Sequence, residues 1–92
     1  MNDAIIIWDL PDDPDGNYFH IVVEGHGVTQ EEVEEVLQSP DSDFDVSTES
    51  GNPIAFGWTS LGQYIAVPFE HVYDDPLTVY PLTAYPVPPP GG

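Results

Sequence analysis

The part of the chain whose structure is best specified by its sequence is Gly25-His26-Gly27-Val28-Thr29-Gln30-Glu31-Glu32-Val33-Glu34-Glu35-Val36-Leu37. Thr29 and Glu32 have the spacing of a capping box, in which the hydroxyl and the carboxylate each accept a backbone N–H at the start of a helix. Three apolar side chains then recur at the spacing of one helix face, and they are Val33, Val36 and Leu37. The stretch therefore predicts a helix from about residue 30 to residue 38, entered through a Gly-His-Gly corner.

The elements on either side of this helix are predicted from residue type. The run Ala4-Ile5-Ile6-Ile7-Trp8 is β-branched and apolar, which predicts a buried strand at the start of the chain. Residues 17–24 are predicted to form a first helix that ends at Gly25, and Gly25 and Gly27 can each take the left-handed conformation that stops a helix. The second helix ends before Pro40, because the residue preceding a proline avoids the helical region.

The second half of the chain alternates as strands do. Residues 41–46 predict an edge strand that carries charge, and residues 53–59 predict a strand whose bulky side chains share one face. Residues 60–63 form a predicted hairpin loop with Gly62 at positive φ. In the return strand, residues 64–69, Pro68 indicates an edge or a bulge. A last strand is predicted over residues 77–85, interrupted by Pro81.

This order predicts an α+β domain with two short helices packed on one face of an antiparallel sheet of four to five strands. We expect residues 1–85 to form that single domain and residues 86–92, rich in Pro and Gly, to form a flexible tail. The apolar face of the second helix is expected to pack against four strand side chains, Ile6, Phe56, Ile65 and Val67.

The charge of the chain is its most unusual property. Its 92 residues include 17 Asp and Glu and no Lys or Arg, so the formal net charge is −17. Chance does not remove every basic residue from a chain of this length, so natural selection or deliberate engineering removed them. The charge argues against nucleic acid and anionic membranes as partners. Crowding of the carboxylates is expected to raise their folded pKa values on balance, so that mild acid and salt both stabilise the fold.

Composition also predicts a soluble, cytoplasmic protein. The start of the chain has no cationic segment typical of a secretory signal, and no apolar run approaches the length of a membrane span. The chain has no cysteine, so disulfides and thiolate metal sites are excluded.

The order of elements resembles the small RelE-like toxins, and the local motifs resemble the BrnT toxin family more specifically. The matching segments cover most of residues 5–85 and are Trp8-Asp9, His26-Gly27-Val28-Thr29 followed by Glu31-Glu32-Val33-Glu34-Glu35-Val36, Gly57-Trp58-Thr59 leading to Gly62-Gln63-Tyr64-Ile65-Ala66-Val67, and Val79-Tyr80-Pro81-Leu82-Thr83-Ala84. The resemblance implies a ribonuclease that blocks translation and is neutralised by an antitoxin. However, Gly25, Trp58 and Gln63 stand where the family pattern has Lys or Arg. RNA cleavage of this kind needs cations to stabilise developing negative charge.

His26, at the glycine-flanked corner, is the one candidate catalytic residue, as a general acid or base. The alternative, which we expect, is a structural role at a helix end. A metal site built from His20, His26 and His71 is not expected, since no two of them have the spacing of neighbours on a helix. No cofactor-binding or metal-binding residue is predicted.

Two further groups of residues have functional and structural readings. The Asp-rich segments at residues 12–15 and 41–45 resemble calcium loops, but neither fits the EF-hand pattern, so turn-forming Asp is expected. Four aromatic side chains on the predicted hairpin could stack on bases, although core positions and cross-strand pairs are expected instead. They are Phe56, Trp58, Tyr64 and Phe69.

These observations predict a non-catalytic domain of the BrnT/RelE-like kind, of unknown role, natural or engineered to lack basic residues. One alternative is a ribonuclease toxin of a toxin–antitoxin pair that uses a bound divalent ion. The other is an acidic interaction module that binds a basic protein surface, such as an antitoxin-like partner.

Overall fold

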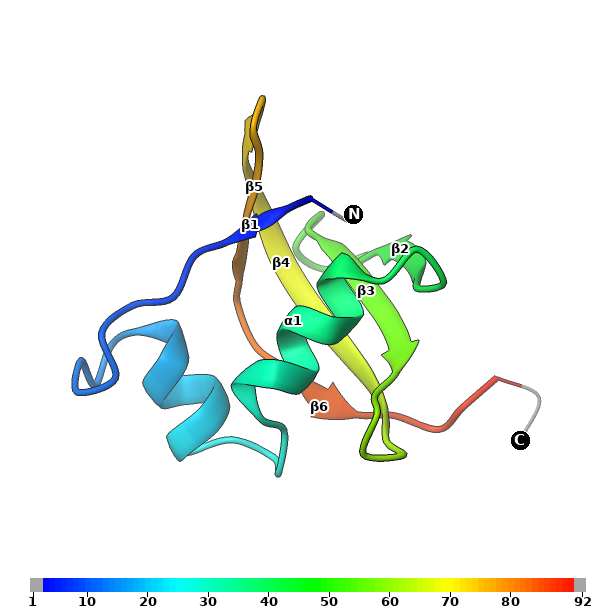
Figure 1. Cartoon of the computed structure of the whole chain (residues 1–92), viewed down its shortest axis with the longest axis horizontal. Helices are drawn as coiled ribbons and strands as arrows, with labels where there is room; N and C mark the ends of the chain where they lie inside the picture. The colour runs from blue at the N-terminus through cyan, green and yellow to red at the C-terminus, as the bar shows by residue number, and fades with distance from the viewer. Residues whose placement is uncertain (1–2, 91–92) are drawn as a thin grey trace.

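The computed structural model describes residues 3–90 of the chain (Figure 1). The elements follow in the order β1 (Ile5–Ile6), η1 (Phe19–Val23), α1 (Gln30–Gln38), β2 (Asp43–Val46), β3 (Pro53–Trp58), β4 (Tyr64–Asp74), β5 (Leu77–Pro81) and β6 (Tyr85–Pro86). The predicted α+β class is confirmed. In residues 3–90 no helix is long and apolar enough to cross a membrane.

The strands form a mixed sheet in the order β1-β5-β4-β3-β2, with β6 also paired to β4. Every pairing is antiparallel except that of β1 with β5, which is parallel. The prediction of an antiparallel sheet is therefore wrong for β1. A strand can pair in parallel with another only through a long crossover connection. Here both helices follow β1 along the chain and precede every other strand, so they provide that connection. The expected buried strand is also wrong, because β1 is a two-residue edge strand and Ile5 is 49% exposed.

Helix α1 is confirmed at the predicted bounds. The Thr29 hydroxyl oxygen accepts from the Glu32 backbone N–H at 3.1 Å, and a Glu32 carboxylate oxygen accepts from the Thr29 backbone N–H at 3.1 Å. The capping box is therefore complete. The predicted apolar face, Val33, Val36 and Leu37, is fully buried.

The first predicted helix is present with a different hydrogen-bond pattern. Two α-helical residues lead into the π-helix η1, whose last bond joins the Glu24 N–H to the Phe19 carbonyl at 2.8 Å. Gly25 follows, and of the two glycines predicted to take a positive φ, Gly27 does so (φ 81°) and Gly25 does not. Gly25 is required by close approach, because a Cβ there would lie 1.8 Å from the carbonyl oxygen of Ile21.

Strand β3 presents its small residues to α1, which places the bulky ones on the other face of the sheet. Ala55 and Gly57 are buried under the helix. A Cβ at Gly57 would lie 2.7 Å from the Ser42 Oγ and 3.4 Å from a Val36 methyl group. The helix is too close to β3 for a large side chain, so the prediction that Phe56 packs under α1 is wrong. Of the other three expected neighbours of the helix, Ile65 and Val67 are in the core, and Ile6 packs against it partly buried.

Strand β4 is eleven residues long and pairs along both sides. Its first half pairs with β3 through Pro68, and its second half pairs with β5 from Phe69 onward. Pro68, which has no N–H, therefore lies where the pairing of β4 with β3 ends and its pairing with β5 begins. This position is neither an edge nor a bulge as predicted, since the bulge lies between His71 and Tyr73.

The last predicted strand is divided in two, as expected from Pro81, and β6 returns to the first half of β4. The chain continues along the sheet beyond β6, where the Val87 N–H donates to the Tyr64 carbonyl at 3.0 Å. Residues 91–92 of the predicted tail, and residues 1–2 of the predicted domain, lie outside the described residues.

Candidate functional site

An open pocket of about 340 Å³ lies where the C-terminal end of α1 meets β2, β3 and the start of β4. Its lining includes Ser39 at the end of α1 and residues of both faces of β3, since Phe56 and Trp58 alternate with Gly57. Three aromatic side chains and two carboxylates line it, namely Phe56, Trp58, Tyr64, Asp41 and Asp43. Pro90 of the C-terminal segment also borders it. The pocket therefore combines π faces with negative charge.

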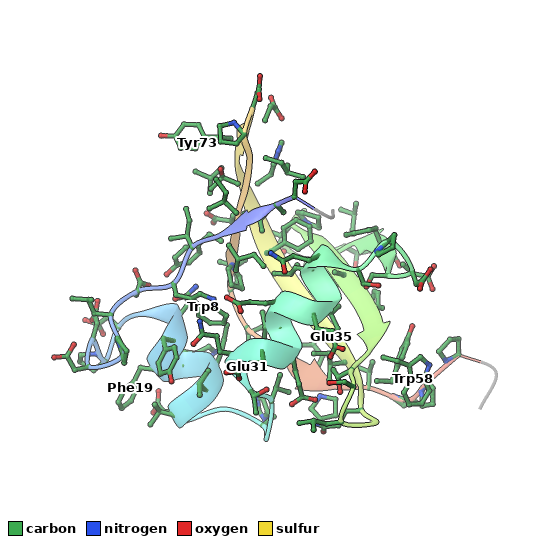
Figure 2. All side chains as sticks on the ribbon, viewed as in Figure 1. Trp8, Phe19, Glu31, Glu35, Trp58 and Tyr73 are labelled. Atoms are coloured by element: carbon green, nitrogen blue, oxygen red, sulfur yellow. The ribbon has the colours of Figure 1, made fainter. Side chains whose placement is uncertain are left out.

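The aromatic wall follows from the register of β3 and β4. Trp58 and Tyr64 are directly opposite each other, and their ring centroids are 5.3 Å apart at an interplanar angle of 59°. The predicted cross-strand pairing is confirmed here. The expectation that these aromatic residues form the core is wrong for Trp58, which is 58% exposed, and for half-buried Phe56 and Tyr64. Figure 2 shows Trp58 at the end of β3, beside the C-terminal segment.

The acidic wall is positioned by the end of α1 and by β2. Asp41 lies three residues beyond the end of the helix, where its N–H donates to the Ser39 hydroxyl at 3.1 Å. Asp43 pairs with Phe56 and so lies on the same face of the sheet. The C-terminal end of a helix carries partial negative charge, and no basic residue lies in the last turn of α1. Helix and carboxylates thus make the pocket favourable for a cation.

This arrangement suits the head group of an arginine or lysine. A cation over the face of a tryptophan or tyrosine gains about 0.5–2 kcal/mol, depending on how far it is desolvated. A carboxylate beside the ring adds a charge-assisted hydrogen bond. The chain has no Lys or Arg of its own to fill the pocket.

The histidines lie apart from this pocket and from one another. His26 is exposed at the corner between η1 and α1, and its ring meets Tyr85 edge-on with 6.4 Å between centroids. His20 is exposed on η1. His71 lies in the second half of β4, where its Nε2 is 3.1 Å from an Asp74 oxygen. The candidate general acid or base, His26, is therefore placed against an aromatic ring.

The Asp-rich segments adopt two different structures. Asp13 accepts the Asp15 N–H at 3.0 Å in an exposed turn, which is the turn-forming role expected. Asp43 and Asp45 belong to β2. Among residues 3–90, no three His, Cys, Asp or Glu side chains are grouped so that they could hold a metal ion.

A second polar cluster surrounds Glu32, which is only 2% exposed. The Thr59 hydroxyl donates to one carboxylate oxygen at 2.6 Å, and the Gln63 amide donates to both oxygens at 3.0 and 3.2 Å. Burial raises the pKa of Glu32, but the hydrogen bonds from Thr59, the Thr29 N–H and Gln63 outweigh it, so the pKa lies below its usual value. Gln63 thus stabilises a buried, charged carboxylate by hydrogen bonding, without carrying any charge itself.

A third cluster, which the sequence does not predict, joins the segment after β1, the residues before η1, and β5. The Tyr80 hydroxyl and the Asn17 N–H both donate to Asp9, while Asn17 donates to the carbonyls of Ile7 and Pro81. The bonds from Tyr80 and Asn17 lower the pKa of Asp9, and the same Asp9 contact raises the pKa of Tyr80 to about 12. Asp9 and Glu32 are thus shifted in the direction opposite to that expected from crowding.

The residues that line the pocket stand out in the sequence, but their arrangement does not. Asp41 and Asp43 belong to a segment weighed as a calcium loop, and the three aromatic residues are assigned to the core. The signal that links them is the alternation of β3, in which small residues occupy one face and bulky ones the other. We compared the chain with protein-family models, with curated proteins and with solved structures, and none of them matches it.

Proposed function

We propose that this protein is a non-catalytic interaction module that binds a basic protein, inserting an arginine or lysine of that partner into the pocket beside Trp58. The observation that carries the proposal is the pocket itself, in which aromatic faces, two carboxylates and the end of a helix meet. A formal net charge of −17 adds long-range attraction toward any basic surface and raises the rate of encounter.

The resemblance to RelE-like toxins supports a protein partner, since such toxins are held by antitoxins. It supports catalysis poorly, because this chain has no Lys or Arg to bind phosphate. The proposal therefore includes no nucleic-acid ligand. Single-stranded RNA should neither bind nor be cut in the presence of a chelator, and cleavage under that condition would overturn the non-catalytic role.

The test uses a fluorescent peptide of alternating arginine and valine, titrated with the full chain at low salt. Replacing Trp58 by Ala should weaken binding about threefold or more, since one cation–π contact is worth up to about 2 kcal/mol, or about thirtyfold in affinity. The matched control is Tyr73→Ala, which removes an aromatic side chain that is 65% exposed at the far end of β4 (Figure 2). That control should leave the affinity unchanged within about twofold, since Tyr73 lies outside the pocket.

The carboxylates are tested in the same way. Asp43→Asn and Asp12→Asn each remove one negative charge from an exposed residue, but only Asp43 lines the pocket. Asp43→Asn should weaken binding more than Asp12→Asn. Equal effects of the two charge variants, together with equal effects of Trp58→Ala and Tyr73→Ala, would refute the pocket. No binding of the basic peptide at low salt would refute the proposed function altogether.

A further inference from the structure

We infer that the basic partner docks as an additional β-strand on the free edge of β2, placing a cationic side chain opposite Asp43 at the pocket. This inference rests on the proposed function and adds the conformation of the bound segment. An extended segment that joins a sheet edge gains main-chain hydrogen bonds, while alternate side chains provide selectivity.

Strand β2 has the properties of such an edge. It is the last strand of the sheet, it pairs with β3 alone among the described strands, and all four of its residues are exposed. Figure 1 shows it at the border of the sheet, next to the end of α1. One side of its backbone is therefore available to another strand, the situation in which edge pairing occurs. At Val46 the added strand would have to displace the Asp45 carboxylate, which accepts the Val46 N–H at 2.8 Å.

The two faces of β2 differ in chemistry. Asp43 and Asp45 pair with Phe56 and Ile54, so their carboxylates extend the face that contains the pocket. Phe44, which is 49% exposed, lies on the opposite face. Its ring meets buried Phe69 edge-on with 6.3 Å between centroids. An added strand would thus meet an acidic row on one face and an apolar row on the other.

These rows select the sequence of the added strand. Opposite charges directly across a strand pair stabilise it by roughly 0.2–1 kcal/mol, which is at most about fivefold in affinity, and like charges destabilise it. A second copy of β2 would place Asp against Asp and bring together two chains of formal charge −17. The chain itself has no Lys or Arg to supply the complement. The occupant is therefore a segment of another protein that alternates basic and apolar residues.

Backbone methylation tests this geometry without changing any charge. In a strand, the N–H groups of alternate residues point to the same edge. Two versions of the arginine–valine peptide are made, one with every odd amide N-methylated and one with every even amide N-methylated. One version should lose about tenfold or more in affinity, because its pairing amides are blocked, and the other should stay within about twofold of the parent. In parallel, the parent peptide should slow hydrogen exchange of those amides of residues 43–46 that face away from β3.

The outcomes separate the two proposals. If both methylated peptides bind alike, or if exchange in residues 43–46 is unchanged by the parent peptide, strand addition is refuted while charge-dependent binding stands. If the parent peptide does not bind, the proposed function itself fails. A dimer of the chain alone in sedimentation, with protected β2 amides, would show that a second copy occupies the edge and would also refute the inference.

Discussion

Replacing Glu32 by Gln is the sharpest test of how this chain stabilises a buried carboxylate without cations. The substitution keeps the shape of the side chain but puts an amide NH₂ where an oxygen accepts from Thr59 and Gln63. Each charge-assisted hydrogen bond is worth about 1.5–3 kcal/mol, against about 0.5–1.5 kcal/mol for a neutral one. The new NH₂ also faces the Gln63 amide donor. We expect a loss of about 2–4 kcal/mol in the free energy of unfolding, or about 10–30 °C in Tm for a domain of this size.

Glu31→Gln is the matched control, because it removes the same charge from the same helical turn at an exposed position. It should cost only about 0.3–1 kcal/mol, the usual value of an anion near a helix N-terminus. Urea denaturation at pH 7, followed by tryptophan fluorescence, measures both variants. If Glu32→Gln lowers the free energy of unfolding no more than Glu31→Gln does, the hydrogen bonds around Glu32 do not stabilise the fold.

The pH dependence supplies a second check. The pKa of Glu32 is lower in the folded chain than its ordinary value of 4.5. Its contribution is therefore fully present above about pH 4.5 and is lost as the pH falls through the folded pKa. The difference in stability between the native chain and Glu32→Gln should narrow as the pH falls from 7 to 3. A difference that stays constant over this range would contradict the lowered pKa.

Four smaller predictions follow from the same structure. Thr29→Ala should cost about 0.5–2 kcal/mol in urea denaturation, since it removes a helix cap. Gly57→Ala should cost about 1–3 kcal/mol by overpacking, and the cost should shrink in a Ser42→Ala background, where the nearest atom to the new Cβ is absent. One tyrosine should ionise near pH 12 in an ultraviolet titration, and this transition should be absent from Tyr80→Phe. Because the contact with Asp9 raises the pKa of Tyr80, the contribution of this contact to folding stability is present below about pH 10 and is lost as the pH rises toward 12. Salt should raise the Tm at pH 7 by screening repulsion among 17 carboxylates, and a Tm that falls with added salt would contradict this.

Local signals in the sequence account for the parts of the fold that were predicted well. The capping box, the apolar face of α1 and the positive φ of Gly62 each depend on residues within a few positions of one another. Their geometry is determined by spacing alone. Spacing along the chain could not predict which face of β3 packs against α1. Alternation shows which side chains share a face, but it does not show which of the two faces the helix covers. Close packing at Gly57 decides that question, and it depends on Val36 and Ser42.

Contacts between distant segments account for the rest. The parallel pairing of β1 with β5 joins residues more than seventy positions apart, and the contact between Asp9 and Tyr80 does the same. The pocket likewise combines the end of α1 with β2, β3 and β4. Each of its members belongs to a recognisable element, but no local pattern indicates that a carboxylate and a tryptophan from different elements share one cavity.

Strand β4 pairs with β3 and β6 along its first half and with β5 along its second. Its central residues therefore stay paired when a single neighbouring strand separates, and they lose their partners only when the domain unfolds. Separating any one of these three strands exposes part of β4 while the rest of its length stays paired. Residues 65–67 have partners on both sides or are buried against α1, so they can be released only when the whole chain unfolds. Their amides should be the last to exchange with solvent deuterium, at a rate that tracks global stability. The amides of β1 and β2, at the two borders, should exchange through smaller fluctuations that leave this central strand intact.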